Sequence, residues 1–180
     1  MVGGKQVVTK EYRLWCNMLN RCYGEKYQQK CPTYSGCLVS ENFKYFQYFA
    51  KWCQSQIGFG LAMYQLDKDI LTRGNKVYSE TTCVFVPRRI NNLLIKSDTI
   101  RGEHPIGVSY DSRDHVYRAY CKDGSYNMKH LGFFDCAESA FNVYKVYKEA
   151  LIRRVATDHK SSIDPRVFDA LMSYEVSISD

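Results

Sequence analysis

Three short segments of alternating apolar and polar residues, followed by one long amphipathic stretch, place the strongest constraint on how this chain can fold. The segments are IGVSYDS, HVYRAYCKDG and YNMKHLGFF, with turn residues at Arg113-Asp114 and Asp123-Gly124 between them. Alternation with a period of two predicts strands, so we expect a three-stranded antiparallel sheet here. The run DCAESAFNVYKVYKEALIRRVA then predicts a helix, with Asp135 as N-cap, that covers one face of the sheet and leaves the other open.

The first hundred residues change from helical to strand-like periodicity. Apolar residues three and four positions apart predict one helix that begins at Thr9 and a second over residues 40–58 with Ser40 as N-cap. Their many aromatic residues are expected in the core rather than stacked on bases. The runs AMYQLDKDIL and TCVFVP predict two strands, with a turn at Gly74-Asn75 between them. The run RRINNLLIKSD predicts a short helix, so residues 61–96 form a ββα unit.

The chain is therefore expected to be an α+β protein with three regions. Residues 1–101 would hold the N-terminal helices and the ββα unit, and residues 102–160 would hold the three-stranded sheet packed on one helix. Residues 161–180 predict a short helical tail that begins at Pro165 and docks onto the body. A chain of 180 residues is long enough to bury a core in such units.

The charge distribution is uneven along the chain. The formal net charge is +6, and residues 1–100 contain 14 Lys and Arg against 7 Asp and Glu. Residues 161–180 contain one Arg against four Asp and Glu. A basic body with an acidic tail suits a polyanion such as nucleic acid, although solubility alone is a second explanation.

Neither a membrane span nor a disulfide framework is expected. No apolar run approaches the roughly 18 residues that cross a bilayer, and the start MVGGKQVVTKEYRLW lacks an apolar signal core. We therefore expect a soluble protein of the cytoplasm, with its eight cysteines reduced and mostly buried as small hydrophobes. A zinc knuckle at Cys22, Cys31 and Cys37 is the less favoured alternative, because the chain has no CxxC pair. The four scattered histidines are given no catalytic role.

The ββα unit carries residues suited to metal-dependent phosphodiester chemistry. Such chemistry needs hard oxygen ligands for a divalent cation and a base for the attacking water. In a ββα site the first strand supplies a carboxylate and the helix supplies a second ligand, and Asp67 and Asn91 occupy these positions. Asp69 has the same side-chain parity as Asp67 on the expected strand. These residues predict a site for Mg²⁺ or Mn²⁺.

In order and spacing, residues 61–96 resemble the HNH endonucleases, particularly the phage-encoded homing-type enzymes that join an HNH unit to a separate DNA-binding module. The run LDKDI falls at the family's Asp-His position, RGNKVYSE at its turn and TTCVFVP at its Asn-Leu-Arg-Trp-Val run, and RRIN delivers Asn91. Lys68 stands where the family has its general-base histidine, and Thr82 where it has an asparagine. The resemblance implies that Asp69 replaces the base, or that Lys68 stabilises the phosphorane charge while solvent takes the proton.

Residues 105–156 are similar to the AP2-type DNA-binding domain. GVSYDSRDHVYRAY and KHLGFFDCAESAFNVY parallel that family's Gly-Val, Trp-Arg-Ala and Leu-Gly-Phe-Phe segments, with Tyr117 in place of the tryptophan. The resemblance implies that the sheet lies in the DNA major groove, where Arg and Lys contact guanine edges and phosphates.

Alternation along the expected middle strand divides its residues between two faces. One face holds Arg118, Tyr120 and Lys122, and the other holds Tyr117, Ala119 and Cys121. We expect the first set to contact DNA, flanked by Arg113 and Lys129, and the second set to meet the helix. The alternative is that the first set is only a solvated sheet face.

Together these features predict a metal-dependent DNA endonuclease or nickase of the phage HNH type, directed to double-stranded DNA by an AP2-like domain. Asp67, Lys68 and Asp69 would act in catalysis, with Asp67 and Asn91 as metal ligands. The alternative is a catalytically degenerate DNA-binding protein, such as a repressor, or a protein inhibitor built on a nuclease scaffold. A protein partner would be expected only in the inhibitor case.

Overall fold

The computed structural model describes residues 8–95, 103–122 and 127–180 of an α+β protein. The chain divides into two compact units. The first contains Met1–Pro87 and Ser162–Val167, and the second contains Arg88–Ser161 and Phe168–Asp180. The division comes at Pro87, whereas the predicted boundary is near residue 102.

In the described part of the first unit, residues 8–87 form three α-helices and two short 3-10 helices. They are α1 (Lys10–Tyr23), α2 (Glu25–Lys30), η1 (Pro32–Tyr34), η2 (Asn42–Lys44) and α3 (Phe46–Ser55). Thr9 is the N-cap of α1, as predicted, and its hydroxyl accepts a hydrogen bond from the backbone N–H of Tyr12 at 3.2 Å. The predicted N-cap Ser40 is wrong, because α3 begins only at Phe46. The Ser40 hydroxyl instead donates to Glu80 at 3.0 Å.

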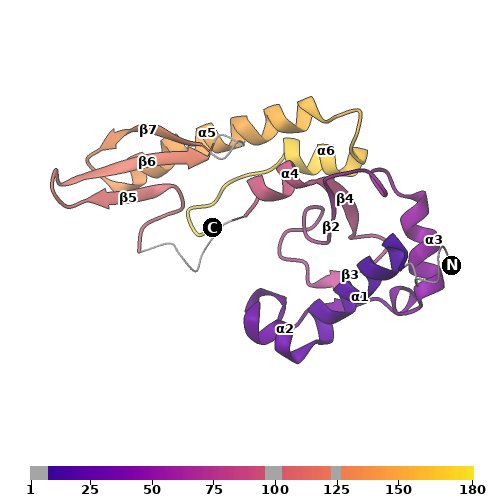
Figure 1. Cartoon of the computed structure of the whole chain (residues 1–180). Helices are drawn as coiled ribbons and strands as arrows, with labels where there is room; N and C mark the ends of the chain where they lie inside the picture. The colour runs from indigo at the N-terminus through magenta and orange to yellow at the C-terminus, as the bar shows by residue number, and fades with distance from the viewer. Residues whose placement is uncertain (1–7, 96–102, 123–126) are drawn as a thin grey trace. The chain divides into compact units, whose positions relative to one another are not determined.

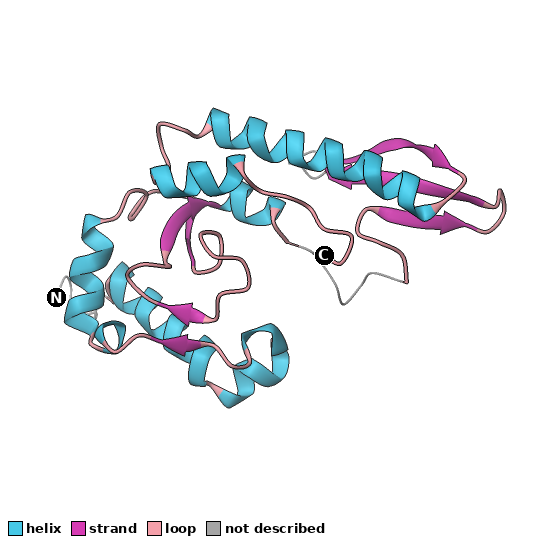
Figure 2. Ribbon diagram, turned by 180° about the vertical axis from the view of Figure 1, so that it is seen from behind, coloured by secondary structure: helices cyan, strands magenta, loops and turns pink. Residues whose placement is uncertain are grey.

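The strands of the first unit form two separate pairs (Figures 1 and 2). Strand β2 (Tyr64–Asp67) lies antiparallel to β4 (Val84–Pro87), which confirms the two predicted strands. Strand β1 (Leu38–Val39) lies parallel to β3 (Val77–Tyr78), a pair that the sequence did not predict. The β1–β3 pair brings the loop after α2 beside the segment that follows the Gly74-Asn75 turn.

Aromatic and cysteine side chains fill the core of the first unit. Phe43 and Phe49 are fully buried, with ring centroids 5.1 Å apart, and the Trp52 ring lies 4.7 Å from Phe43. The predicted core role is confirmed for these three aromatic residues, whereas Tyr12, Tyr45 and Tyr48 of the same two predicted helices are exposed. Burial is also confirmed for five of the eight free cysteines, namely Cys22, Cys37, Cys53 and Cys83 in this unit and Cys121 in the second unit.

The second unit contains the predicted three-stranded sheet on a helix (Figures 1 and 2). Its elements are α4 (Arg88–Leu93), β5 (Val108–Asp111), β6 (Val116–Lys122), β7 (Met128–Phe134) and α5 (Ala137–Asp158). The strands are antiparallel in the order β5-β6-β7, and α5 packs against all three. The predicted N-cap of α5 is one residue early, since Cys136 rather than Asp135 holds that position. Helix α4 packs against α5, which explains why it belongs to this unit.

The C-terminal segment forms the predicted helix α6 (Pro165–Met172) and then follows α5. The backbone N–H of Val176 donates to Glu149 at 2.9 Å, and the Lys145 ammonium donates to the Val176 carbonyl at 2.9 Å. These two bonds confirm that the tail docks onto the body. In the part of the chain that the structure describes, no helix is both long enough and apolar enough to span a membrane.

Candidate functional site

Strand β2 ends at Asp67, and the carboxylate of Asp67 stabilises the turn that follows. One oxygen, Oδ1, accepts hydrogen bonds from the backbone N–H groups of Asp69 at 2.9 Å and Ile70 at 2.8 Å. An aspartate that binds the backbone two residues ahead forms an Asx turn, which competes with continued strand pairing. Asp69 therefore lies beyond the end of β2, and the strand parity that grouped it with Asp67 does not apply.

Partial burial of Asp67 has an electrostatic consequence. Loss of hydration and the neighbouring Asp69 carboxylate together raise the pKa of Asp67 to about 6. The two backbone N–H bonds act in the opposite direction, because they stabilise the charged form. Near neutral pH the turn therefore holds two close carboxylates, of which Asp69 is ion-paired with Lys68.

Lys68 is buried in the turn, with 8% of its surface exposed. Its ammonium group donates to Asp69 Oδ2 at 3.0 Å and to the Asn75 carbonyl at 2.8 Å. The same nitrogen lies 5.9 Å from the centre of the Tyr78 ring. Two acceptors and an aromatic ring surround this nitrogen, so the geometry presents Lys68 as a positive charge and not as a proton acceptor.

Asn75 holds the turn closed, a role that sequence reasoning missed. Its side-chain nitrogen donates to the Lys68 carbonyl at 2.6 Å and to the Val77 carbonyl at 2.7 Å, and its oxygen accepts from the Val77 N–H at 3.1 Å. Gly74 precedes it with a φ of +76°, which favours glycine. The Gly74-Asn75 turn signal was the only sequence clue to this residue.

Thr82, at the family's asparagine position, also serves the local backbone. Its hydroxyl donates to the Val77 carbonyl at 2.8 Å and lies 2.8 Å from the Ser79 hydroxyl. It therefore fastens the connection between β3 and β4.

The predicted metal ligands Asp67 and Asn91 fall in different units, because Asn91 lies on α4. Their pairing stays a prediction. Within residues 8–95, 103–122 and 127–180 there is no group of three His, Cys, Asp or Glu that could hold a metal ion, so the zinc alternative gains no support. The same absence applies to a Mg²⁺ site of three such side chains, so Mg²⁺ would need Asp67 or Asp69 together with water and phosphate oxygens, a common arrangement for this ion.

The second candidate site is the sheet of the second unit. Ala119 and Cys121 are buried and Tyr117 is partly buried, as expected for residues that face α5. Arg118, between them, pairs in register with Ser109 of β5 and Phe133 of β7. The face opposite the helix therefore carries Arg118.

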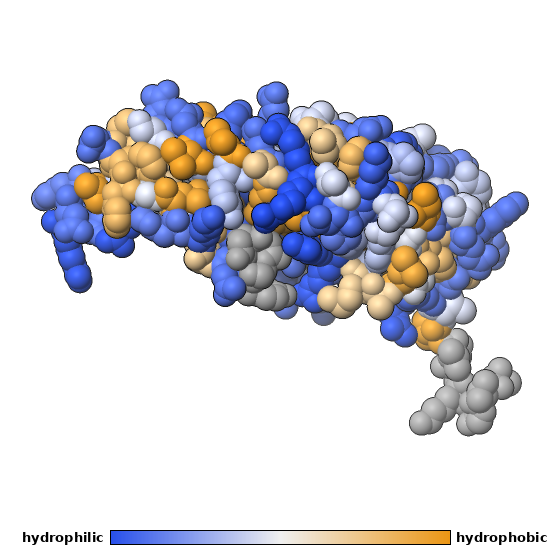
Figure 3. All heavy atoms as spheres, turned by 90° about the horizontal axis from the view of Figure 1, so that it is seen from above, coloured by the Kyte–Doolittle hydropathy of each residue, from blue (hydrophilic) through white to orange (hydrophobic). Residues whose placement is uncertain are grey.

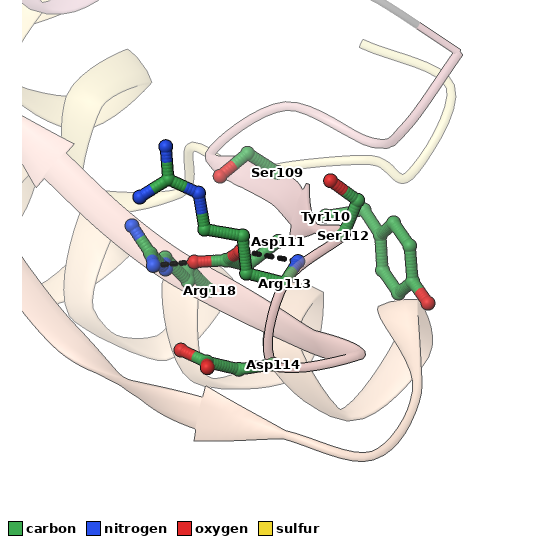
Figure 4. A pocket seen from close by; sticks show the side chains of 7 residues that line it. All are labelled: Ser109, Tyr110, Asp111, Ser112, Arg113, Asp114 and Arg118. Carbon is green, nitrogen blue, oxygen red and sulfur yellow. Dashed lines mark hydrogen bonds and ion pairs between the residues drawn. The ribbon is translucent and has the colours of Figure 1, made fainter.

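Arg118 is held in place by two neighbours. Its guanidinium forms an ion pair with Asp111 and lies 5.6 Å from the centre of the Phe133 ring. Its Nε atom is buried without a hydrogen-bond partner. A pocket of about 510 Å³ adjoins these groups, and Figure 4 shows the Asp111 carboxylate between Arg118 and the backbone nitrogen of Arg113. The pocket is lined by Ser109, Tyr110, Asp111, Ser112, Arg113, Asp114 and Arg118.

A β-bulge in β7 changes which residues share the open face. Ala119 pairs with Gly132 but Tyr120 pairs with His130, so Leu131 is left without a partner in the ladder. His130 and Phe133 consequently lie side by side, with ring centroids 4.6 Å apart. Phe133 is 59% exposed, and sequence reasoning assigned neither residue to the site.

The remaining predicted DNA contacts separate into two groups. Lys122 is exposed and Tyr120 partly buried, and both share the face of Arg118. Lys129 pairs with the buried Cys121, and its ammonium lies 4.9 Å from the ring of Tyr147 on α5. Lys129 is therefore on the helix side of the sheet, whereas the prediction placed it beside the open face.

Figure 3 shows hydrophobic residues at the surface interspersed with hydrophilic ones.

Known proteins offer no further guide to either site. No protein-family model, curated protein or solved structure matches the chain.

Proposed function

We propose that the protein is a metal-dependent DNA endonuclease or nickase of the phage HNH type, directed to double-stranded DNA by an AP2-like sheet. The observation that supports it most is the partly buried Asp67 carboxylate beside Asp69 at the end of β2. Because Lys68 pairs with Asp69, the partly buried Asp67 carboxylate is the charge whose cost a divalent cation would offset. The order of β2, β4 and α4 along the chain is also that of a ββα unit.

In this proposal Asp67 would bind Mg²⁺ or Mn²⁺ at the end of β2, and the predicted second ligand is Asn91 of α4. When bound, the ion would polarise the scissile phosphate and lower the pKa of a water molecule. Lys68 places a fixed positive charge near the phosphate, where it stabilises the charge that develops on the phosphoryl oxygens. Asp69, half exposed at the same turn, accepts the proton from the attacking water in place of the family's histidine.

The sheet of the second unit would select the DNA site. A sheet covered by a helix on one side and open on the other can enter the major groove. Arg118 and Lys122 supply positive charge on the open face, Tyr120 lies between them along β6, and Arg113 adds a second guanidinium at the adjoining pocket.

A second candidate is a DNA-binding protein without catalysis, such as a repressor, or an inhibitor that binds a protein. The observation that favours it is the enclosure of Lys68. Its ammonium already contacts Asp69 and the Asn75 carbonyl, and it stands where the family's general base would be. A nuclease scaffold that had lost its base would keep the fold and the DNA-binding sheet.

Supercoiled plasmid incubated with Mg²⁺ separates the two candidates. The wild-type protein should convert it to open circles, and Asp67→Ala and Asn91→Ala should each abolish the conversion. Asp169→Ala, which removes an exposed carboxylate from α6, is the matched control and should nick normally. Tight duplex binding without conversion would identify the repressor. Equal conversion by wild type and Asp67→Ala would refute the nuclease site.

A further inference from the structure

Arg21, near the end of α1, is a partly buried cation surrounded by tyrosines. Its Nη1 atom donates to the Tyr78 hydroxyl at 3.5 Å, the outer limit of a hydrogen bond, and its guanidinium lies 5.4 Å from the centre of the Tyr34 ring. The residues that the structure describes provide no carboxylate partner for it. Among the described residues, the Tyr78 hydroxyl accepts one of its five N–H donors, so the other donors can bind a ligand.

A guanidinium removed from water is costly to keep without an anion. Its charge loses hydration, and ring contacts return only part of that loss. Binding of a ligand of opposite charge would offset this loss of hydration energy. The surroundings of Arg21 therefore favour an anion with several oxygen acceptors, which matches the guanidinium fork.

A second cation lies beside the same tyrosine. Lys68 approaches the face of the Tyr78 ring at 5.9 Å, while Arg21 approaches the hydroxyl end of that ring. Tyr78 is itself buried, with 1% of its surface exposed, so the ring that both cations contact is packed in the core. Asp69 is half exposed and forms an ion pair with Lys68, so Arg21 is the one of these two cations that has no carboxylate partner among the described residues.

The elements around Arg21 are tied together. The side-chain nitrogen of Gln28, on α2, donates to the carbonyls of Cys22 at 2.5 Å and Arg21 at 3.3 Å. The Lys76 ammonium, in the loop before β3, donates to the Thr33 carbonyl of η1 at 2.7 Å. A site built on fastened elements loses little conformational entropy when a ligand binds.

We propose that Arg21, together with Lys68, binds a phosphate group of the DNA backbone next to the Asp67 turn. The guanidinium of Arg21 contacts two phosphate oxygens and Lys68 acts as a point charge behind it. The proposal rests on the proposed function for the choice of DNA as the source of the phosphate. It adds a positioning residue from α1 to a site that the sequence places wholly in residues 61–96.

Duplex binding without cleavage is the first test, carried out in EDTA over a range of salt concentrations. Arg21→Gln should lower the affinity about tenfold. It should also reduce the slope of log K against log salt by about 1. Arg13→Gln removes the same charge from an exposed position on the same helix and is the matched control. Equal losses in the two variants would show that only overall charge matters and would overturn the proposal.

Folding is monitored by thermal unfolding of the same variants. Arg21→Gln leaves no carboxylate stranded, so its Tm should be within a few degrees of the wild-type Tm. If its Tm falls further, Arg21→Lys decides the question, because it keeps the charge but not the fork. An affinity for Arg21→Lys between those of wild type and Arg21→Gln supports the proposal, and a wild-type affinity for Arg21→Lys overturns it.

Inorganic phosphate distinguishes a free anion from the DNA backbone. Stabilisation of the wild type but not of Arg21→Gln by phosphate, together with the change in salt slope, supports a phosphate site that DNA uses. Stabilisation without any change in DNA affinity overturns the assignment to DNA. Binding in EDTA does not depend on nicking, so the two proposals are tested separately. The Asp67 variants can refute the nuclease while the phosphate site stands, and the Arg21 variants can refute the phosphate site while the nuclease stands.

Discussion

Replacement of Asp67 with asparagine separates the charge of this carboxylate from its structural role. The amide oxygen of the substituted side chain would still accept the backbone N–H groups of Asp69 and Ile70, so the Asx turn is kept. The negative charge beside Asp69 is removed. We therefore expect Asp67→Asn to raise the free energy of unfolding near neutral pH, although it removes a proposed metal ligand.

The magnitude follows from the pKa of Asp67, which burial and then Asp69 raise to about 6. A pKa about two above the ordinary value of Asp corresponds to about 3 kcal/mol of unfavourable free energy for the ionised carboxylate. Asp69 is half exposed, so solvent screens part of the repulsion. We expect a net gain of about 1–2 kcal/mol for Asp67→Asn, which corresponds to about 2–8 °C in Tm.

The gain should depend on pH. Because the folded-state pKa of Asp67 lies above the unfolded-state pKa, its favourable contribution is fully present below about pH 4 and is lost as the pH rises through about 6. Wild type and Asp67→Asn should therefore differ little at pH 4, and the variant should be the more stable at pH 7.5. Thermal and urea unfolding followed by circular dichroism at both pH values give the difference.

Asp169→Asn is the control, since it removes an exposed carboxylate and should not reproduce the pH dependence. A lower stability of Asp67→Asn at pH 7.5, or an equal change at both pH values, would refute the reasoning. In that case Asp67 would be stabilised in its charged form by its two backbone N–H donors.

Three further substitutions test other parts of the structure. Asn75→Ala removes three hydrogen bonds of the turn and should lower the free energy of unfolding by about 2–4 kcal/mol, measured in urea. Gly107→Ala should cost about 2–5 kcal/mol by the same measurement, because Gly107 has a φ of +78° and an added Cβ would overlap the buried Tyr144 ring. Arg118→Gln should weaken duplex binding about tenfold in fluorescence anisotropy, while Lys129→Gln, on the helix side, should weaken it less. Equal losses would contradict the assigned open face.

Several elements were predictable from local sequence because backbone geometry imposes their periods. Alternation with a period of two identified β5, β6 and β7, and apolar residues at helical spacing identified α1 and α5. The Thr9 cap and the Pro165 helix start were also predictable, since each depends on one residue and its immediate neighbours.

Other features depend on contacts that no local pattern records. Strand pair β1–β3 is two residues long on each side, too short for any periodicity, and its strands are far apart in the chain. The unpaired Leu131 shifts the register of β7, which brings His130 onto the face of Phe133 and moves Lys129 to the helix side. Strict alternation cannot reveal such a shift, because a bulge changes the side-chain parity on one strand only.

The sequence by itself determined the secondary structure of the sheet unit, the aromatic core and the residue types at the candidate turn. Asp67, Lys68 and Asp69 could be singled out because they are charged residues within a ββα pattern. The bonds from the backbone N–H groups of Asp69 and Ile70 to Asp67 are local, whereas only the tertiary structure decided that Lys68 contacts the Asn75 carbonyl and that Tyr78 contacts both Lys68 and Arg21. The physical reason is that periodicity follows from short-range backbone geometry, whereas the partners of a buried charge are set by how distant segments pack around it.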